Sequence, residues 1–114
     1  FDQVVNDPQM PLSWRQEALV RKGVVLEQLK RNDEALEAWH TVLTEPPQGE
    51  NPDDYWFHRA GEKALRLLES RGSYDEAVTI AEKMAQVPGP RGQAAAELVN
   101  QLALKYGIWR ELKK

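Results

Sequence analysis

Apolar residues recur at three- and four-residue intervals along most of this chain, and that spacing is typical of amphipathic helices. The first such helix is predicted over residues 14–30. Ser13 with Gln16 three residues later forms a capping box, which places the beginning of the helix at this point. The apolar residues on one face of this segment are Ala18, Leu19, Val25, Leu26 and Leu29.

A second helix is predicted after the turn formed by Lys30, Arg31 and Asn32. Pro46 and Pro47 end it, because proline cannot donate a backbone hydrogen bond and disfavours helical geometry in the residue before it. The apolar face of this helix consists of Ala35, Leu36, Trp39, Val42 and Leu43.

The second half of the chain continues the pattern. A third helix is predicted from an N-cap at Asn51, with Pro52 as its first residue, to about Ser70. A fourth opens with another capping box, formed by Ser73 and Glu76.

A fifth helix is predicted over residues 91–105, and its inward-facing residues are Leu98, Val99 and Leu102. No segment shows the alternation expected of a β-strand. The predicted fold class is therefore all-α, built from antiparallel helix pairs joined by short turns.

Two of these helices open with almost the same residues. Residues 32–36 read NDEAL and residues 74–78 read YDEAV, and a proline follows each about one helix length later, at Pro47 and Pro88. A helix-opening motif that recurs with its neighbouring helices is the signature of a helical-repeat protein. Proteins of this class act mainly by offering a surface.

The pattern resembles the tetratricopeptide repeat, a helix–turn–helix unit of 34 residues, and the match is good over residues 16–49. Gly23 stands where the two helices of a unit cross. The other matching positions of this unit are Leu26, Ala35, Trp39 and Pro47.

A second unit over residues 58–91 is looser. It matches at Leu68, Gly72, Tyr74, Ala77 and Ala81. Leu65, however, stands where the family has a small residue. Either Ala64 or Gly61 then allows the close helix approach, or the helices splay apart.

The ends resemble cut repeats. Residues 1–8, with Phe1, Val4 and Val5, match the tail of a preceding unit, and residues 92–112 match a partial unit or a capping helix. The resemblance implies that residues 1–114 form one right-handed α-solenoid. Each helix pair would cover the open apolar face of its neighbour.

The spacing departs from the family at one place, since Ala35 and Ala77 are 42 residues apart, eight more than expected. This predicts that the helix from Asn51 begins about two turns early. Two interpretations follow for the aromatic residues that it carries there. They staple the extension onto the preceding pair, or they form an exposed ledge for binding. These residues are Tyr55, Trp56 and Phe57.

Composition narrows the classes of function. The chain has no cysteine, which excludes disulfides and thiolate metal sites. It also lacks a signal peptide and an apolar run of about 20 residues, so no membrane span is predicted. The composition is compatible with a soluble protein of either the cytoplasm or the periplasm. The first residue, Phe1, is not a methionine, which suggests a piece of a longer protein.

Charge is distributed unevenly. Residues 1–57 carry 11 acidic and 5 basic side chains, whereas residues 58–114 carry 7 acidic and 10 basic ones. Such asymmetry can guide a charged partner to one end. The cations of the second half are interleaved with carboxylates, so no nucleic-acid partner is predicted.

Candidates for chemistry are few. His40 and His58 have no second His, Asp or Glu at a metal-ligand spacing with matching geometry elsewhere. The serines are explained as helix caps or ends without a base to activate them, and residues 89–92 lack the Lys–Ser pair of a phosphate-binding loop. We therefore expect no catalytic residue, cofactor or metal.

The resemblance implies a concave groove lined by the first helix of each pair. Mapped onto this sequence, it consists of Glu17, Val20, Arg21, Val24, Glu27 and Gln28, and of Arg59, Glu62, Lys63, Arg66 and Glu69. Some family members clamp a carboxyl-terminal tail with a lysine and an asparagine in this groove. Val20 and Val24 occupy those positions here, so that clamp is not expected.

Two interpretations of these residues remain. In the first, the apolar strip of Val20 and Val24 and the cations of the second unit bind a segment with acidic and apolar residues. In the second, the face is an ordinary solvated one, where Glu62 pairs with Arg59 and Arg66.

The predicted function is a non-catalytic protein–protein interaction module, a scaffold or adaptor within a larger protein. One alternative is a structural or self-associating solenoid that stacks through its apolar ends. Another is a regulatory or recruiting arm of an enzyme outside this chain. The partner is expected to be a protein or peptide.

Overall fold

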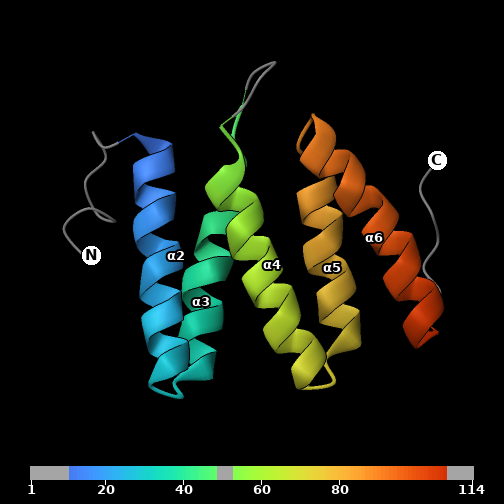
Figure 1. Ribbon diagram of the computed structural model, residues 1–114, viewed down its shortest axis with the longest axis horizontal. Helices are drawn as coiled ribbons and strands as arrows, with labels where there is room; N and C mark the ends of the chain where they lie inside the picture. The colour runs from blue at the N-terminus through green and yellow to red at the C-terminus, as the bar shows by residue number, and fades with distance from the viewer. Residues whose placement is uncertain (1–10, 49–52, 108–114) are drawn as a thin grey trace.

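The computed structural model describes residues 11–48 and 53–107, and this part of the chain is built from five helices (Figure 1). About 80% of it is helical and none of it lies in a strand, which confirms the all-α fold class. The helices are α2 (Leu12–Gln28), α3 (Asn32–Leu43), α4 (Tyr55–Ser70), α5 (Tyr74–Ala85) and α6 (Pro90–Tyr106).

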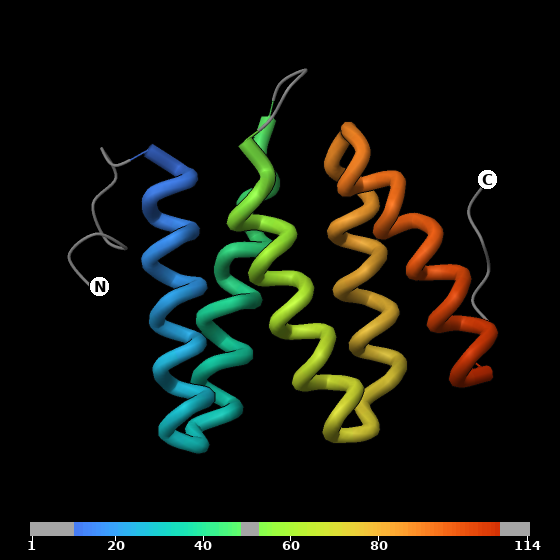
Figure 2. The backbone as a smooth tube through the Cα atoms, in the orientation of Figure 1, coloured from blue at the N-terminus to red at the C-terminus, as the bar shows by residue number. Residues whose placement is uncertain are grey.

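Successive helices run in opposite directions and each packs against the next (Figure 2). The α2–α3 and α4–α5 turns lie at one end of the molecule, and the other two connections lie at the opposite end. In addition, α2 contacts α4 directly. The predicted helix pairs are therefore present as α2 with α3 and α4 with α5.

The two tight turns have the same backbone geometry. Lys30 and Gly72 adopt left-handed conformations, with φ of 62° and 77°. In the first turn the amide of Arg31 donates to the Leu26 carbonyl, and in the second the amide of Ser73 donates to the Leu68 carbonyl, at 2.8 and 2.9 Å. These bonds, with the inner ones from Lys30 and Gly72, define a Schellman ending at each turn.

The predicted capping boxes are wrong. Helix α2 begins at Leu12 after Pro11, and Ser13 lies inside it. Gln16 is buried, and its Nε2 donates to the Glu45 carbonyl at the end of α3 instead. Ser73 precedes α5 as predicted, but its side chain makes no capping hydrogen bond.

Helix α4 begins later than the sequence predicted. Its first residue is Tyr55, and Asp53 and Asp54 precede it. Asn51 and Pro52 lie outside the described residues. The extra length therefore lies between the end of α3 at Leu43 and the beginning of α4 at Tyr55. Because Asp53 and Asp54 are not helical, the helical extension predicted from Asn51 is wrong.

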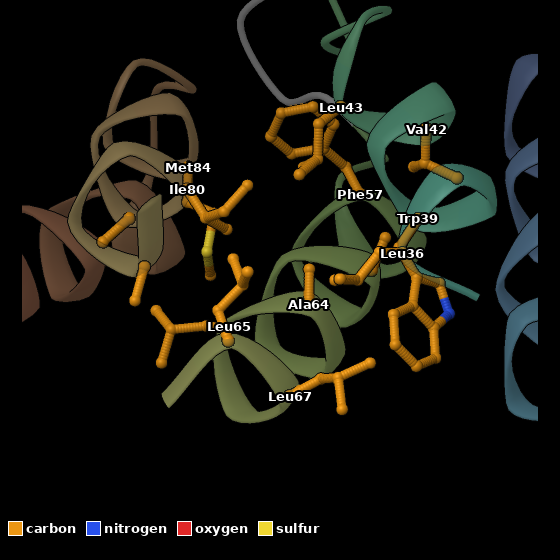
Figure 3. Packing of buried hydrophobic residues seen from close by; sticks show 14 of the residues in the cluster. Leu36, Trp39, Val42, Leu43, Phe57, Ala64, Leu65, Leu67, Ile80 and Met84 are labelled. Atoms are coloured by element: carbon orange, nitrogen blue, oxygen red, sulfur yellow. The ribbon is translucent and has the colours of Figure 1, made fainter. Parts of the chain in front are cut away.

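The core runs between the helices as one cluster (Figure 3). Its largest fully buried side chains include Trp39, Phe57, Leu68 and Ile80. The apolar face predicted for α3 is confirmed, because all five of its residues are buried. For the first helix the prediction fails at Val25 and at the C-cap Leu29, which are 44% and 60% exposed.

Glycines mark the closest helix contact in each pair. A Cβ added at Gly23 would lie 2.2 Å from Trp39 Nε1, which confirms the predicted crossing of α2 and α3. In the second pair, a Cβ at Gly61 would lie 2.4 Å from Met84 Sδ. Of the alternatives raised by Leu65, Gly61 is therefore the residue that admits the close approach.

Candidate functional site

The exposed side of the adjacent helices α2 and α4, here called the α2–α4 face, carries most of the predicted groove residues. On α2, Arg21 Nε donates to Glu17 Oε2 at 2.8 Å, Val24 is half-buried and Gln28 is exposed. Val20 is only 2% exposed and belongs to the core, so its predicted place in the groove is wrong. Its position on the helix turns it toward the interior, where its carbonyl accepts a hydrogen bond from the Trp39 indole.

On α4, charged side chains occupy positions 59, 62, 63 and 66, a spacing that places them on one side of the helix. Arg66 and Glu62 are exposed, and Arg59 and Lys63 are half-buried. Within the described residues, none of these four forms an ion pair within 4.0 Å. The predicted pairing of Glu62 with Arg59 and Arg66 is therefore not formed, and the three cations face solvent.

The aromatic residues at the beginning of α4 divide between core and surface. Phe57 is 1% exposed and packs in the core, so it is not part of an exposed ledge. Tyr55 is 48% exposed and Trp56 is half-buried, with the two rings edge to face at 4.9 Å. Arg21 lies over the Trp56 ring and Arg91 over the Tyr55 ring, at 5.5 and 5.7 Å. These two rings thus connect α2 with α6.

A charged cluster links α4 to α6 beneath these rings. Asp54, which is 6% exposed, accepts a hydrogen bond from Arg91 Nη1 at 2.8 Å through its Oδ1. Its other oxygen, Oδ2, lies 3.3 Å from His58 Nε2, in a geometry that is not aligned for a hydrogen bond. The Asp54 charge is therefore compensated chiefly by a half-exposed guanidinium.

His58 is the unusual member of this cluster. It is 3% exposed, and neither of its ring nitrogens has a hydrogen-bond partner in the described chain. A buried polar group left unsatisfied costs about 1–3 kcal/mol. Burial lowers the pKa of His58 below its ordinary value of 6.5, and Arg91 acts in the same direction, although the Asp54 and Glu62 carboxylates oppose it.

The first helix pair satisfies the equivalent position in part, because one of the two polar side-chain atoms there, Gln16 Oε1, has no hydrogen-bond partner among the described residues. Gln16, 42 residues before His58, is equally buried and donates to the Glu45 carbonyl at 3.0 Å. That bond joins the beginning of α2 to the end of α3. His58 makes no such bond to the backbone: its Nε2 lies 3.3 Å from Asp54 Oδ2, and its Nδ1 has no hydrogen-bond partner among the described residues.

A cavity of about 290 Å³ adjoins His58 and lies between α4, α5 and α6. Its walls combine polar and apolar groups, which include His58, Glu62, Met84, Arg91, Ala94 and Leu98. Small-molecule sites typically measure ~300–1,000 Å³. This cavity is at the lower end of that range and suits a single side chain better than a nucleotide-sized cofactor.

Sequence reasoning missed this cluster, although part of its signal was present. Asp54 and Glu62 stand four residues before and after His58, so helical spacing alone brings them to the same side. Arg91 had no such signal, because it lies 37 residues from Asp54. His40, the other histidine, is half-buried on α3, and burial lowers its pKa as well.

These side chains can hold a ligand through hydrogen bonds, charge and apolar contact. In the part of the chain that the structure describes, no cluster of three His, Cys, Asp or Glu side chains is placed to hold a metal ion. Over residues 11–48 and 53–107, no helix has the length and apolar character needed to cross a membrane.

Comparison with known proteins finds no match: no family model, no curated protein and no solved structure is similar to this chain. The functional argument therefore depends on the residues and their geometry.

Proposed function

We propose that this chain is a right-handed, tetratricopeptide-like α-solenoid that acts as a non-catalytic protein–protein interaction module. Its partner is an acidic segment of another protein that lies across the α2–α4 face. Support for the repeat architecture comes from the two helix pairs with identical Schellman turns and a glycine at each close contact.

The observation that carries the binding proposal is the set of cations on α4. Arg59, Lys63 and Arg66 make no ion pair with the rest of the described chain, so a partner's carboxylates need not displace internal ones. Glu17 already neutralises Arg21 on the neighbouring helix. The positive charge is therefore concentrated on α4, where arginines can bind carboxylates in bidentate fashion.

Charge reversal tests the proposal. A fluorescein-labelled peptide rich in glutamate with one tyrosine and one leucine is titrated with the full chain, and binding is followed by anisotropy. Arg59→Glu/Arg66→Glu is expected to weaken binding at least tenfold. Raised salt is expected to weaken binding to the unmodified chain, because exposed charges are screened.

The matched control is Lys30→Glu/Lys83→Glu, which changes the net charge equally but lies on the α2–α3 turn and on α5. It is expected to bind the peptide about as well as the unmodified chain. An equal loss of peptide affinity in the two double variants would show that binding depends only on net charge. That result would contradict a defined site on α4. Circular dichroism confirms that both variants remain helical.

A second candidate function, self-association, is favoured by one observation. Helix α2 and its C-cap expose Trp14, Val25 and Leu29, with exposed fractions of 58%, 44% and 60%. A cavity of about 320 Å³ lies nearby, lined in part by Leu19, Leu26 and Ala38. Exposed apolar patches of this kind often mark interfaces.

Sedimentation at increasing concentration distinguishes the two functions. A Trp14→Ser/Leu29→Ser variant is expected to abolish any concentration-dependent dimer, while leaving peptide binding unchanged. The apolar ends noted in the sequence (Phe1, Val4, Val5; Ile108, Trp109, Leu112) lie outside the described residues.

A further inference from the structure

We propose that the cavity between α4, α5 and α6 is a specificity pocket for one aromatic side chain with an N–H or O–H group, a tyrosine or tryptophan of the bound acidic segment. This inference rests on the proposed function. It adds an anchor residue to a partner that was so far defined only by its charge.

The apolar wall of the pocket favours an aromatic ring. Met84 provides a polarizable thioether, which makes favourable contacts with ring edges, and Leu98 is a second large apolar residue of the lining. Ala94 keeps its part of the wall open because its side chain is small. The volume of about 290 Å³ accommodates one such side chain. Buried aromatic anchors of this kind dominate many protein interfaces.

The polar side of the pocket favours a ring that carries a donor. His58 lines the pocket, with its Nε2 3.3 Å from Asp54 Oδ2 and its Nδ1 without a hydrogen-bond partner among the described residues. A neutral imidazole that carries its proton on Nε2 has Nδ1 available as an acceptor. Because both ring nitrogens are buried in the structure, this hydrogen bond requires the imidazole to reorient about χ2 when the side chain enters. At the mouth, Glu62 has no ion-pair partner among the described residues and offers a second acceptor.

The position of the pocket agrees with the binding face. Glu62 belongs to the charged group on α4 and also lines the pocket, so the two sites are contiguous. A segment whose carboxylates bind Arg59 and Arg66 can place a neighbouring side chain between α4 and α6. Arg91, which is held by Asp54, borders the same opening and can stack on an aromatic ring.

Methionine methyl NMR of the full chain tests the pocket directly. The protein contains two methionines, Met10 and Met84, and a Met10→Leu variant assigns the Met84 signal. The acidic peptide with tyrosine is expected to shift the Met84 methyl signal upfield through the ring current. Replacement of the tyrosine by phenylalanine is expected to weaken binding about fivefold, since one hydrogen bond is lost. Replacement by alanine is expected to weaken it about thirtyfold.

Variants of the pocket complete the test. Ala94→Leu fills the cavity from an exposed position and is expected to weaken the tyrosine peptide at least tenfold, but not the alanine peptide. Ala96→Leu, also exposed on α6 but not part of the pocket lining, is the matched control and is expected to have no effect.

Failure of the pocket and failure of the proposed function give different results. Equal affinity for the tyrosine and alanine peptides would overturn the pocket and leave the acidic partner intact. Tighter binding of a lysine-substituted peptide would also overturn it, because the pocket would then select a cation. If no peptide binds, N-acetyl-tyrosinamide at millimolar concentration still reports on the pocket. If N-acetyl-tyrosinamide shifts the Met84 methyl signal, the aromatic pocket is supported and only the acidic partner is rejected. If the Met84 signal does not shift, the pocket and the acidic partner are both rejected.

Discussion

The indole of Trp39 lies against Gly23 so closely that an added methyl group would overlap the ring, at 2.2 Å from Nε1. The same nitrogen donates to the Val20 carbonyl at 3.2 Å, inside the core. One large residue on α3 thus requires one small residue on α2, and a hydrogen bond fixes the orientation of the ring. Trp39 is completely buried, so its packing holds the first helix pair together.

Gly23→Ala is expected to destabilise the protein by about 2 kcal/mol. Overpacking and disturbance of the indole hydrogen bond each cost about 1–3 kcal/mol, whereas the better helix propensity of alanine returns about 1 kcal/mol. Urea denaturation followed by circular dichroism measures the change. In a Trp39→Phe background the same substitution is expected to cost less, because the crowded nitrogen is absent. A Gly23→Ala variant as stable as the unmodified chain would contradict this close packing.

Substitutions at the two Schellman turns are expected to change the stability of the protein in opposite directions. Lys30 and Gly72 occupy the same left-handed position, but lysine is strained there and glycine is not. Lys30→Gly is therefore expected to stabilise the protein by about 0.5–1 kcal/mol, and Gly72→Ala to destabilise it by about 1 kcal/mol. Thermal denaturation of the two variants beside the unmodified chain measures both. If the two substitutions shift the denaturation midpoint in the same direction, the turns are not equivalent.

The sequence was sufficient to predict five helices, because their apolar residues recur at helical spacing. The family resemblance placed Gly23 at the crossing of α2 and α3, but only the structure identifies Trp39 as the residue that packs against it. The sequence was not sufficient to place Val20. The helical period gives the exposed arc of α2 only approximately, and direct contact with α4 decides which edge of that arc is covered.

The beginning of α4 and the His58 cluster were missed for a related reason. Asn51, Pro52 and the two aspartates carry helix-start signals whether they lie in a helix or just before one. The partner that fixes Asp54 is Arg91 on α6, 37 residues further along the chain. The local sequence pattern around Asp54 does not predict that contact. Long-range contacts of this kind determine the candidate site more than propensity does.

The last turn of α6 is attached to the α4–α5 turn by Tyr106. Its ring stacks on Tyr74 at 3.8 Å, and its hydroxyl donates to Glu69 Oε2. The Tyr106→Ala variant, which loses both contacts, is expected to increase amide hydrogen exchange in the second half of α6. Tyr106→Phe keeps the stacking and is expected to have a smaller effect. Equal exchange in all three proteins would show that this contact does not hold α6 in place.

The Tyr106 hydroxyl provides a second measurement of the same contact. Its hydrogen bond to Glu69 raises the pKa of Tyr106 above the ordinary value of 10.0, and burial contributes in the same direction. Glu69→Gln is expected to move that pKa back toward the ordinary value. Tyrosinate absorbance during a pH titration detects the change, and the Tyr106→Phe variant identifies which of the three tyrosines is responsible. An unchanged titration in Glu69→Gln would contradict the hydrogen bond.

His58 makes the stability of the fold depend on pH, with a sign that follows from its burial. Its pKa in the folded state is lowered from 6.5, so the unfolded chain takes up a proton more readily. The stabilising contribution of the neutral ring is fully present above about pH 6.5 and is lost as the pH falls through the folded pKa.

His58→Gln tests this contribution, because glutamine is the residue at the equivalent buried position of the first pair. The free energy of unfolding of this variant is expected to fall less steeply than that of the unmodified chain between pH 7.5 and pH 5. Burial also lowers the pKa of His40, so His40→Gln serves as the parallel control and the double variant removes both contributions. Imidazole NMR titration separates the two histidines. A folded-state His58 pKa above 6.5 would show that Asp54 outweighs burial, and stability would then rise on acidification through that pKa.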